Sequence, residues 1–287
     1  MTLSVVRWGQ HPLSFQLASP DSDVVARASL VFRPWRLASS AETSYAWRVN
    51  PVAAGANRAW RISDESGAAP LTRESIPAAV RCVEFLAVQK LVDSPAACTM
   101  HGALVARNGC GIALVGRAES GKSTLACALW QRGFALLGDD IALVDVGRRV
   151  AWPAPRRVGL RESSRALLSC ALWRRVVATP TTDGTDEGCL FHPDDVDGRT
   201  RPASVPLKAL VFLDRPGRRA GRDIARLDPA HGLVALLPHT NLALRTNTGE
   251  AIHRLRPLLE SVAAWDLART GLDGMIHAVE HVLEASD

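Results

Sequence analysis

The stretch HGALVARNGCGIALVGRAESGKSTLACALWQRGFALLGDDIALVD, residues 101–145, decides the fold of this chain. At its centre, residues 116–123 read GRAESGKS and fit the phosphate-loop pattern G-x-x-x-x-G-K-[ST]. The apolar run IALV precedes this loop, and the helix-like run STLACALW follows it. Strand, loop and helix in that order are the context that a phosphate loop requires. We therefore predict a nucleotide phosphate site here.

The loop supplies the predicted nucleotide contacts through its amides and two side chains. Backbone N–H groups and the positive end of the following helix attract phosphate oxygens. Lys122 provides a point charge for the β- and γ-phosphates, and the Ser123 hydroxyl is suited to Mg²⁺. A carboxylate facing a triphosphate would be repelled, so we expect Glu119 to point outward. The predicted nucleotide-binding residues are Gly116, Arg117, Ala118, Glu119, Ser120, Gly121, Lys122, Ser123 and Thr124.

Composition restricts the class of protein. The chain has 287 residues, 47% of them hydrophobic, and a net charge of +5, which is typical of a globular protein. That net charge is lower than is typical of nucleic-acid-binding proteins, and the sequence has no basic segment interleaved with aromatic residues. The six cysteines form no C-x-x-C pair, and a metal site built on Cys98 and His101 is disfavoured because no second pair follows. With no apolar leader and no long apolar window, we expect a cytoplasmic protein without nucleic-acid or membrane partners.

The pattern along the chain predicts two parts. Residues 1–75 carry short strand-like runs separated by turn signals and form a small β-rich accessory domain, with strands expected at 4–8, 28–32, 46–49 and 60–62. Ser75 and Pro77 then open a helix that begins the second domain, residues 76–287. Because strands and helices are mixed after the phosphate loop, this domain is assigned to the α/β class.

The second domain is expected to begin with a hairpin around Asn108-Gly109 that leads into the loop. Further strands are expected at residues 134–137, 141–145 and 208–213, the last being the final strong strand. Helices are expected near residues 123–130, 229–237, 249–263 and 272–283. Residues 152–161 are predicted to be an irregular loop, and residues 180–206 a surface loop.

The pair Asp139-Asp140 indicates the reaction. It follows the loop lysine after one helix and one return strand, which brings both carboxylates beside the γ-phosphate. One can accept the proton of an attacking hydroxyl while the other, with Ser123, holds Mg²⁺. A turn built on Asp-Asp is the alternative. His101 lies at the start of the strand pair, and before any family resemblance is considered it is best explained as an ordinary polar residue.

Together these motifs resemble the catalytic domain of the HPr kinase/phosphorylase family. The resemblance rests on TMHGALV at residues 99–105, the phosphate loop, and RGFALLGDD at residues 132–140. It covers roughly residues 99–145, weakens towards the C-terminus, and is absent from residues 1–75. It is nearest to the HPr-kinase-related serine kinases.

The resemblance implies a nucleotide domain like that of phosphoenolpyruvate carboxykinase and ATP-dependent phosphorylation of a serine hydroxyl. Asp139 takes the role of base, Asp140 lies on the acceptor and metal side, and His101 contacts the base and phosphate. Lys122 and Ser123 hold phosphate and Mg²⁺. A peptide or small protein, such as a ribosomally made precursor peptide, is the implied acceptor, and a homo-oligomer the implied assembly.

Three departures from the family pattern change these expectations. The loop has Ala118-Glu119 in place of Ser-Gly, and Thr124 replaces a glutamate. Instead of the family's E-I-R-G-L-G-I segment, residues 155–161 read PRRVGLR and contain no glutamate, so we do not expect phosphorylase activity. Arg161 is our candidate to clamp phosphate or the acceptor.

Two other functions remain open on the sequence. A small-molecule kinase also combines a phosphate loop with a nearby aspartate, although its loop usually lies near the N-terminus. A nucleotide-binding regulator without catalysis is the other alternative, with Glu119 as the sign of lost activity. The sequence leaves the acceptor, the choice between ATP and GTP, and the role of residues 1–75 undecided.

Overall fold

A computed structural model describes most of the chain as two compact units. The described residues are 3–10, 13–33, 45–54, 57–65, 67–94, 98–154, 156–185, 187–199, 201–213 and 223–285. The units are Met1–Ala96 and Ala97–Asp287. The division therefore falls after residue 96, whereas the sequence suggested a boundary after residue 75.

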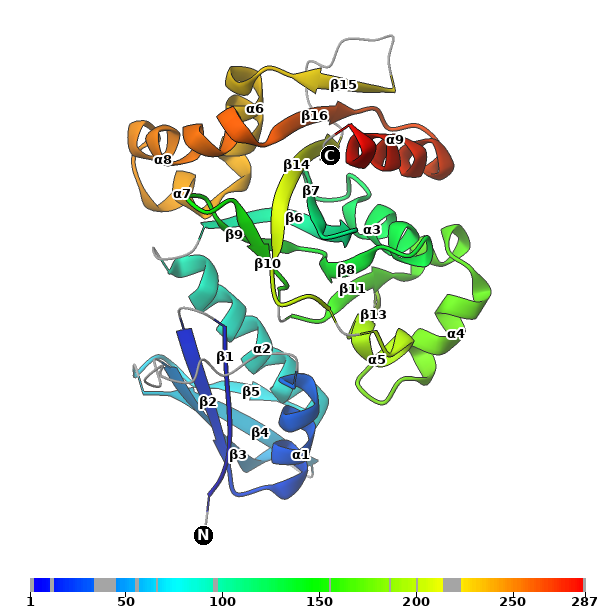
Figure 1. Cartoon of the computed structure of the whole chain (residues 1–287). Helices are drawn as coiled ribbons and strands as arrows, with labels where there is room; N and C mark the ends of the chain where they lie inside the picture. Colours follow the sequence, from blue (N-terminus) through cyan, green and yellow to red (C-terminus); the bar gives the residue numbers. More distant parts are fainter. Residues whose placement is uncertain are drawn as a thin grey trace. The chain divides into compact units, whose positions relative to one another are not determined.

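The N-terminal unit is a five-stranded sheet in the order β1-β2-β3-β4-β5 (Figure 1). Its elements are β1 (Ser4–Gln10), β2 (Leu13–Ser19), α1 (Ser22–Val31), β3 (Tyr45–Ala54), β4 (Asn57–Asp64), β5 (Leu71–Arg73) and α2 (Ile76–Asp93). Neighbouring strands are antiparallel except for β2 and β3, which are parallel and are connected through α1.

The two helices of this unit explain the two differences from the sequence prediction. The strand expected at residues 28–32 is wrong, because Asp21 caps a helix there and Val24, Ala28 and Val31 are buried at helical spacing. Helix α2 does begin after Ser75, whose side chain accepts from the N–H of Ala78 as an N-cap. It packs against α1, β4 and β5, and its apolar face therefore belongs to the N-terminal unit.

The C-terminal unit is built on a large mixed sheet in the order β10-β9-β6-β7-β14-β16-β15, with β8 also paired to β6. Strand β14 is parallel to both β7 and β16. The hairpin of β6 and β7 turns at Asn108-Gly109 as expected. The strands are β6 (Cys98–Arg107), β7 (Cys110–Gly116), β8 (Ala135–Gly138), β9 (Ile141–Asp145), β10 (Val150–Trp152), β14 (Val205–Leu213), β15 (Ile224–Leu227) and β16 (Ala263–Leu267).

The described residues of this unit also form a separate three-stranded sheet, β11-β13-β12. It consists of β11 (Val158–Arg161), β12 (Asp183–Thr185) and β13 (Gly188–Phe191). The helices are α3 (Lys122–Gln131), α4 (Cys170–Ala178), α5 (Pro193–Asp197), α6 (Pro229–Leu236), α7 (Asn241–Arg245), α8 (Thr248–Ser261) and α9 (Leu272–Glu284). The 3₁₀ helix η1 (Glu162–Leu167) lies between β11 and α4, and the 3₁₀ helix η2 (Leu237–His239) lies between α6 and α7.

Three sequence expectations are wrong in this unit. Residues 158–161 form β11 rather than irregular loop, and much of residues 180–206 is ordered in β12, β13 and α5. A buried ion pair between Arg157 and Asp183 and the buried side chain of Phe191 stabilise this region. The helix expected through residue 263 ends at Ser261, and the strand that follows it, β16, lies inside the sheet.

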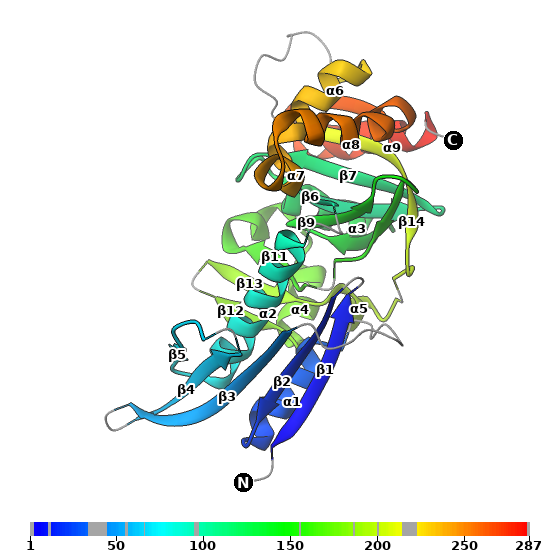
Figure 2. The same ribbon diagram turned by 90° about the vertical axis from the view of Figure 1, so that its left-hand side faces the viewer.

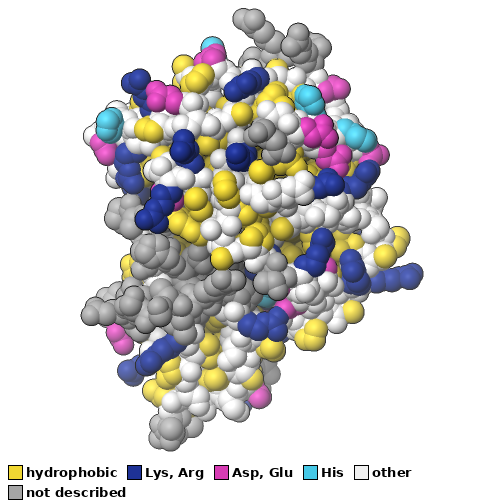
Figure 3. Space-filling model, viewed as in Figure 1, with side chains coloured by type: hydrophobic (Ala, Val, Ile, Leu, Met, Phe, Trp, Pro, Cys, Tyr) yellow, Lys and Arg dark blue, Asp and Glu magenta, His cyan; other side chains and the backbone are white. Residues whose placement is uncertain are grey.

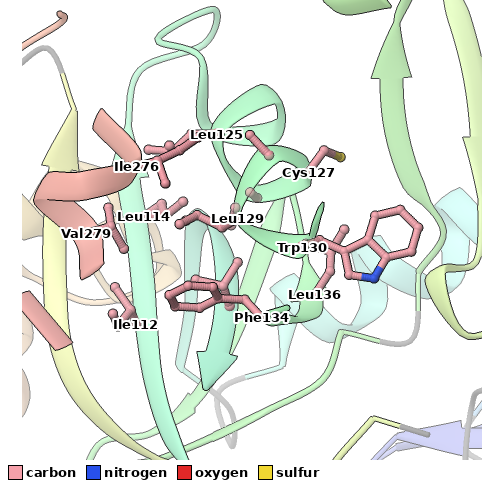
Figure 4. Packing of buried hydrophobic residues seen from close by; sticks show 14 of the residues in the cluster. Ile112, Leu114, Leu125, Cys127, Leu129, Trp130, Phe134, Leu136, Ile276 and Val279 are labelled. Carbon is pink, nitrogen blue, oxygen red and sulfur yellow. The ribbon is translucent and has the colours of Figure 1, made fainter. Parts of the chain in front are cut away.

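The central strands are buried on both faces and separate two cores. On β7, Ile112 and Leu114 face one core, whereas Ala113 and Val115 face the other. Helices α3 and α9 cover the first face, and α6, α7 and α8 group on the second (Figures 1 and 2). Figure 4 shows side chains of α3 and α9 meeting those of β7 in the first core. This double burial fixes the end of β7, where the phosphate-loop motif begins.

One face of the C-terminal unit can be followed in space-filling form. On the face seen in Figure 3, its basic and acidic side chains are interspersed among apolar and neutral groups. No helix in the described part of the chain is long and apolar enough to span a membrane.

Candidate functional site

The predicted phosphate loop lies between the buried strand β7 and the first turn of α3. Gly116 closes the strand in a position where a Cβ atom would lie 2.7 Å from Ser120 Oγ and 2.8 Å from the Leu213 carbonyl oxygen. Gly121 is the N-cap with φ 94°, a left-handed conformation that favours glycine. The first amides of α3 have no acceptor within the helix, so they are available to an anion at this end.

Two polar side chains of the loop are buried at the helix end. Lys122 is 5% exposed, and its Nζ donates to the carbonyl oxygens of Gly116 (3.0 Å) and Arg117 (2.6 Å). Its burial lowers the pKa of its ammonium group, while the Asp140 and Asp139 charges act in the opposite direction. The buried Ser120 Oγ has no hydrogen-bond partner among the described residues. Both groups fit a loop that hydrogen-bonds an oxyanion.

The two aspartates occupy the short turn between β8 and β9. Asp139 is 6% exposed, and its Oδ2 accepts from the N–H of Gly159 at 2.8 Å. Burial, reinforced by the charge of Asp140, raises the pKa of the Asp139 carboxyl to about 7. Asp140 is more open, and its Oδ2 accepts from Arg156 Nη1 at 2.7 Å. The adjacent carboxyls therefore differ sharply in environment.

His101 lies beside this turn at the register position of β6 that faces Ile141 on β9. Partial burial lowers the pKa of its imidazole, and the charge of Lys122 lowers it further. Its ring stacks on that of His239 from η2, with centroids 6.5 Å apart and planes inclined by 24°. The pKa of His239 is lowered by its burial and by the positive charges around it. The His101 ring is thus neutral near pH 7.

Glu119 points away from the loop interior, as expected from its charge. Its side chain is 73% exposed, and its carboxylate accepts from Arg161 Nη1 at 2.8 Å. The guanidinium also lies 3.8 Å from Glu187. Glu119 has φ 65°, a left-handed backbone conformation that is unfavourable for a residue with a Cβ atom. Arg161 therefore joins the small sheet to the loop, and its role as a clamp stays a prediction.

A cleft of about 960 Å³ brings the predicted residues together. Of the predicted site residues, only Gly116 and Arg117 are not among those that line it; both instead provide the carbonyls that hold Lys122. The predicted residues on its wall are His101, Ala118, Glu119, Ser120, Gly121, Lys122, Ser123, Thr124, Asp139, Asp140 and Arg161. The loop, the acid pair and the histidine therefore open onto one space.

Several residues of the cleft were not predicted as site residues. Arg156 lies on its wall, and the hydroxyls of Ser164 and Thr124 are 2.7 Å apart. An apolar part of the wall comes from η1 and α9, including Leu167, Leu272 and Met275. His239 stacks on His101 but does not line the cleft. The sequence contains a cluster of arginines at residues 156–161, which could have indicated Arg156 as a site residue. Ser164 and the apolar part of the wall come from η1 and α9, and long-range packing brings them to the site.

The residues predicted to bind Mg²⁺, Ser123 and Asp140, both line the cleft. A hydroxyl and a carboxylate suit Mg²⁺, which binds few protein oxygens and retains several waters. Within the described residues, no group of three or more His, Cys, Asp or Glu side chains is arranged to hold a metal. The donor set therefore fits a cation shared with phosphates rather than an all-protein cage.

Comparisons with known proteins find similarity to solved structures only. No family model matches the chain, and no curated protein matches it. The HPr(Ser) kinase/phosphatase from Coxiella burnetii aligns with 65% of this chain and 88% of its own, at 13% identity and a TM-score of 0.34. At that score the likeness supports no conclusion about activity. The chain is a mixed α/β protein whose chemistry has to be inferred from its own cleft.

Proposed function

We propose that this chain is an ATP-dependent kinase that transfers the γ-phosphoryl group to a serine hydroxyl of a peptide or small protein. The observation that carries the proposal is the meeting, in one cleft, of a phosphate-loop lysine and a buried carboxyl with a pKa near neutrality. The first suits binding of a nucleotide tail, and the second suits removal of a proton from an acceptor.

Phosphate binding is supported by the loop and by the start of α3. The amides at the N-terminus of α3 and the buried Ser120 hydroxyl supply neutral donors. Lys122 supplies the charge, because it can exchange its bonds to the Gly116 and Arg117 carbonyls for phosphate oxygens. Glu119 stays outside on its bond to Arg161, so its charge does not oppose the nucleotide.

Asp139 is our candidate for the general base. A base is most effective when its pKa lies close to the working pH, and burial brings this carboxyl there. The Gly159 N–H fixes one of its oxygens and so orients the group. Asp139 accepts the serine proton as the hydroxyl oxygen forms a bond to the γ-phosphorus. The bond from the γ-phosphorus to the β,γ-bridging oxygen breaks, and ADP leaves with its electron pair.

Ser123 and Asp140 would hold Mg²⁺, which neutralises phosphate charge when bound. His101, being neutral near pH 7, can donate a hydrogen bond without adding charge beside Asp139. The assignment of a peptide serine as acceptor rests on the sequence resemblance. Arg161, on the exposed rim, is suited to an acidic group of that acceptor or to phosphate.

The test is a transfer assay with the purified full chain. The protein is incubated with γ-labelled ATP or GTP, Mg²⁺, and peptides encoded beside its gene, each also made with its serines changed to alanine. We expect label on the serine peptides only. Labelling of a free metabolite instead would favour a small-molecule kinase, and nucleotide binding without transfer to any acceptor would favour a regulator.

Two variants and their controls assign the roles. Asp139→Asn should retain nucleotide binding but lose transfer by roughly 10²–10⁴-fold, whereas Asp145→Asn at the other end of β9 should not. Lys122→Ala should weaken nucleotide binding at least about tenfold, whereas Lys208→Ala on β14 should not. Wild-type transfer by Asp139→Asn would refute the assignment of the base.

A further inference from the structure

The contact between Arg156 and Asp140 lies where the proposed function needs a metal ligand. Arg156 Nη1 donates to Asp140 Oδ2 at 2.7 Å, and both residues line the cleft. Their side chains are 28% and 42% exposed, so water reaches both partners. The arginine therefore neutralises the same carboxylate that a divalent cation would use.

The Arg156–Asp140 ion pair can be separated more easily than the ion pair of the next residue, Arg157. Arg157 is fully buried and pairs with buried Asp183, and separating them would leave charges in the protein interior. The Arg156–Asp140 pair is partly exposed to solvent, and such pairs contribute little free energy. Arg156 can therefore leave Asp140 at small cost, whereas Arg157 remains fixed.

Among the cationic side chains of the cleft, Arg156 is the one suited to bind a phosphate group in exchange for Asp140. Arg161, the arginine on its rim, already contacts two glutamates, and Lys122 is the loop's own cation. Arg156 lines the same cleft, where its contact within the described residues is with Asp140 of the acid pair. A guanidinium offers a planar set of donors that matches phosphate oxygens, so a phosphate group in this space would compete for it.

We infer that Arg156 is an exchangeable cation of the site: it occupies Asp140 before the metal nucleotide arrives, and it then transfers its hydrogen bonds to the nucleotide phosphates. This inference rests on the proposed nucleotide site. It makes Arg156 both a competitor of the metal at Asp140 and a binding residue for the phosphates. Those two roles have opposite consequences when the charge is removed.

The experiment measures two equilibria in the full-length protein and its Arg156→Gln variant. Binding of Mn²⁺ alone, followed by electron paramagnetic resonance, should become about two- to fivefold tighter in the variant, because the competing guanidinium is gone. Binding of ATP·Mg²⁺, followed by calorimetry, should become about tenfold weaker. Arg156→Lys keeps the positive charge but lacks the planar guanidinium. Its affinities for Mn²⁺ and for ATP·Mg²⁺ should both lie between those of the wild type and Arg156→Gln.

Controls separate this inference from damage to the fold and from the proposed function. Arg148→Gln, which removes the partner of Asp145 at the other end of β9, should change neither equilibrium. If Arg156→Gln binds both Mn²⁺ and ATP·Mg²⁺ more weakly, or binds both as the wild type does, Arg156 is not an exchangeable cation. If the wild-type protein binds neither Mn²⁺ nor the nucleotide, the proposed function fails first.

Discussion

Replacing Asp139 by asparagine should stabilise the protein in alkaline solution and have little effect in acid. The carboxyl is 6% exposed, and burial together with the Asp140 charge raises its pKa from 3.8 to about 7. Between these two pH values the folded protein retains a proton that the unfolded chain releases. The free energy of unfolding therefore falls as pH rises through this window, and an amide has no proton to release.

The size of the effect follows from the same pKa. The difference between 3.8 and about 7, at about 1.4 kcal/mol for each pH unit, amounts to about 4 kcal/mol. This is an upper bound on the gain of Asp139→Asn above pH 7, because the variant must still accept the Gly159 N–H with its amide oxygen. At pH 4 the two proteins should differ only slightly, since the folded wild type already holds the proton.

The assay is urea unfolding of the metal- and nucleotide-free protein in EDTA, at intervals from pH 4 to pH 8. The quantity of interest is the difference between the unfolding free energies of variant and wild type, which removes contributions from other titrating groups. When both proteins also carry Asp140→Asn, this difference should stop rising at a lower pH. The reason is that the Asp140 charge, one of the causes of the raised Asp139 pKa, is gone. A difference that is constant across this range would refute a buried, proton-holding Asp139.

Three further substitutions test other parts of the site. Glu119→Gly removes a side chain from a backbone position with positive φ, which is unfavourable by about 1 kcal/mol, so we expect a slightly higher melting temperature. Because the carboxylate lies outside the loop on Arg161, nucleotide binding by calorimetry should not change; a change in affinity would show that the carboxylate acts on the nucleotide. Gly116→Ala places a Cβ atom 2.8 Å from the Leu213 carbonyl oxygen and should cost about 1–3 kcal/mol in urea unfolding. Arg157→Ala leaves Asp183 charged and buried, and should cost about 3–5 kcal/mol by the same measurement; a loss within 0.5 kcal/mol, typical of a surface site, would contradict the burial.

The parts of the fold that follow local rules were predictable from the sequence. The run from the Asn108-Gly109 turn to the acid pair combines turn chemistry, apolar periodicity and a fixed motif, and its strands and helix lie where expected. Residues 28–32 were misassigned because a short β-branched and apolar run suits either a strand or one face of a helix. Residues 180–206 looked like loop because their polar side chains find buried partners only in three dimensions.

The site shows the same division between local and long-range information. The outward orientation of Glu119 follows from its charge alone, and its bond to Arg161 is consistent with that reasoning. The contact between Arg156 and Asp140 and the stacking of His239 on His101 join segments far apart in sequence. Neither residue type nor spacing specifies those pairings, since they depend on how β11 and η2 pack.

The double burial of β7 and β14 has a consequence for how this protein can vary. Adding or deleting one residue in either strand would exchange the side chains of the two cores and would move the Gly116 end relative to Leu213. Changes in length are therefore confined to segments outside this frame. Because neither strand can change length without repacking both cores, the starting point of the phosphate-loop motif at Gly116 is fixed.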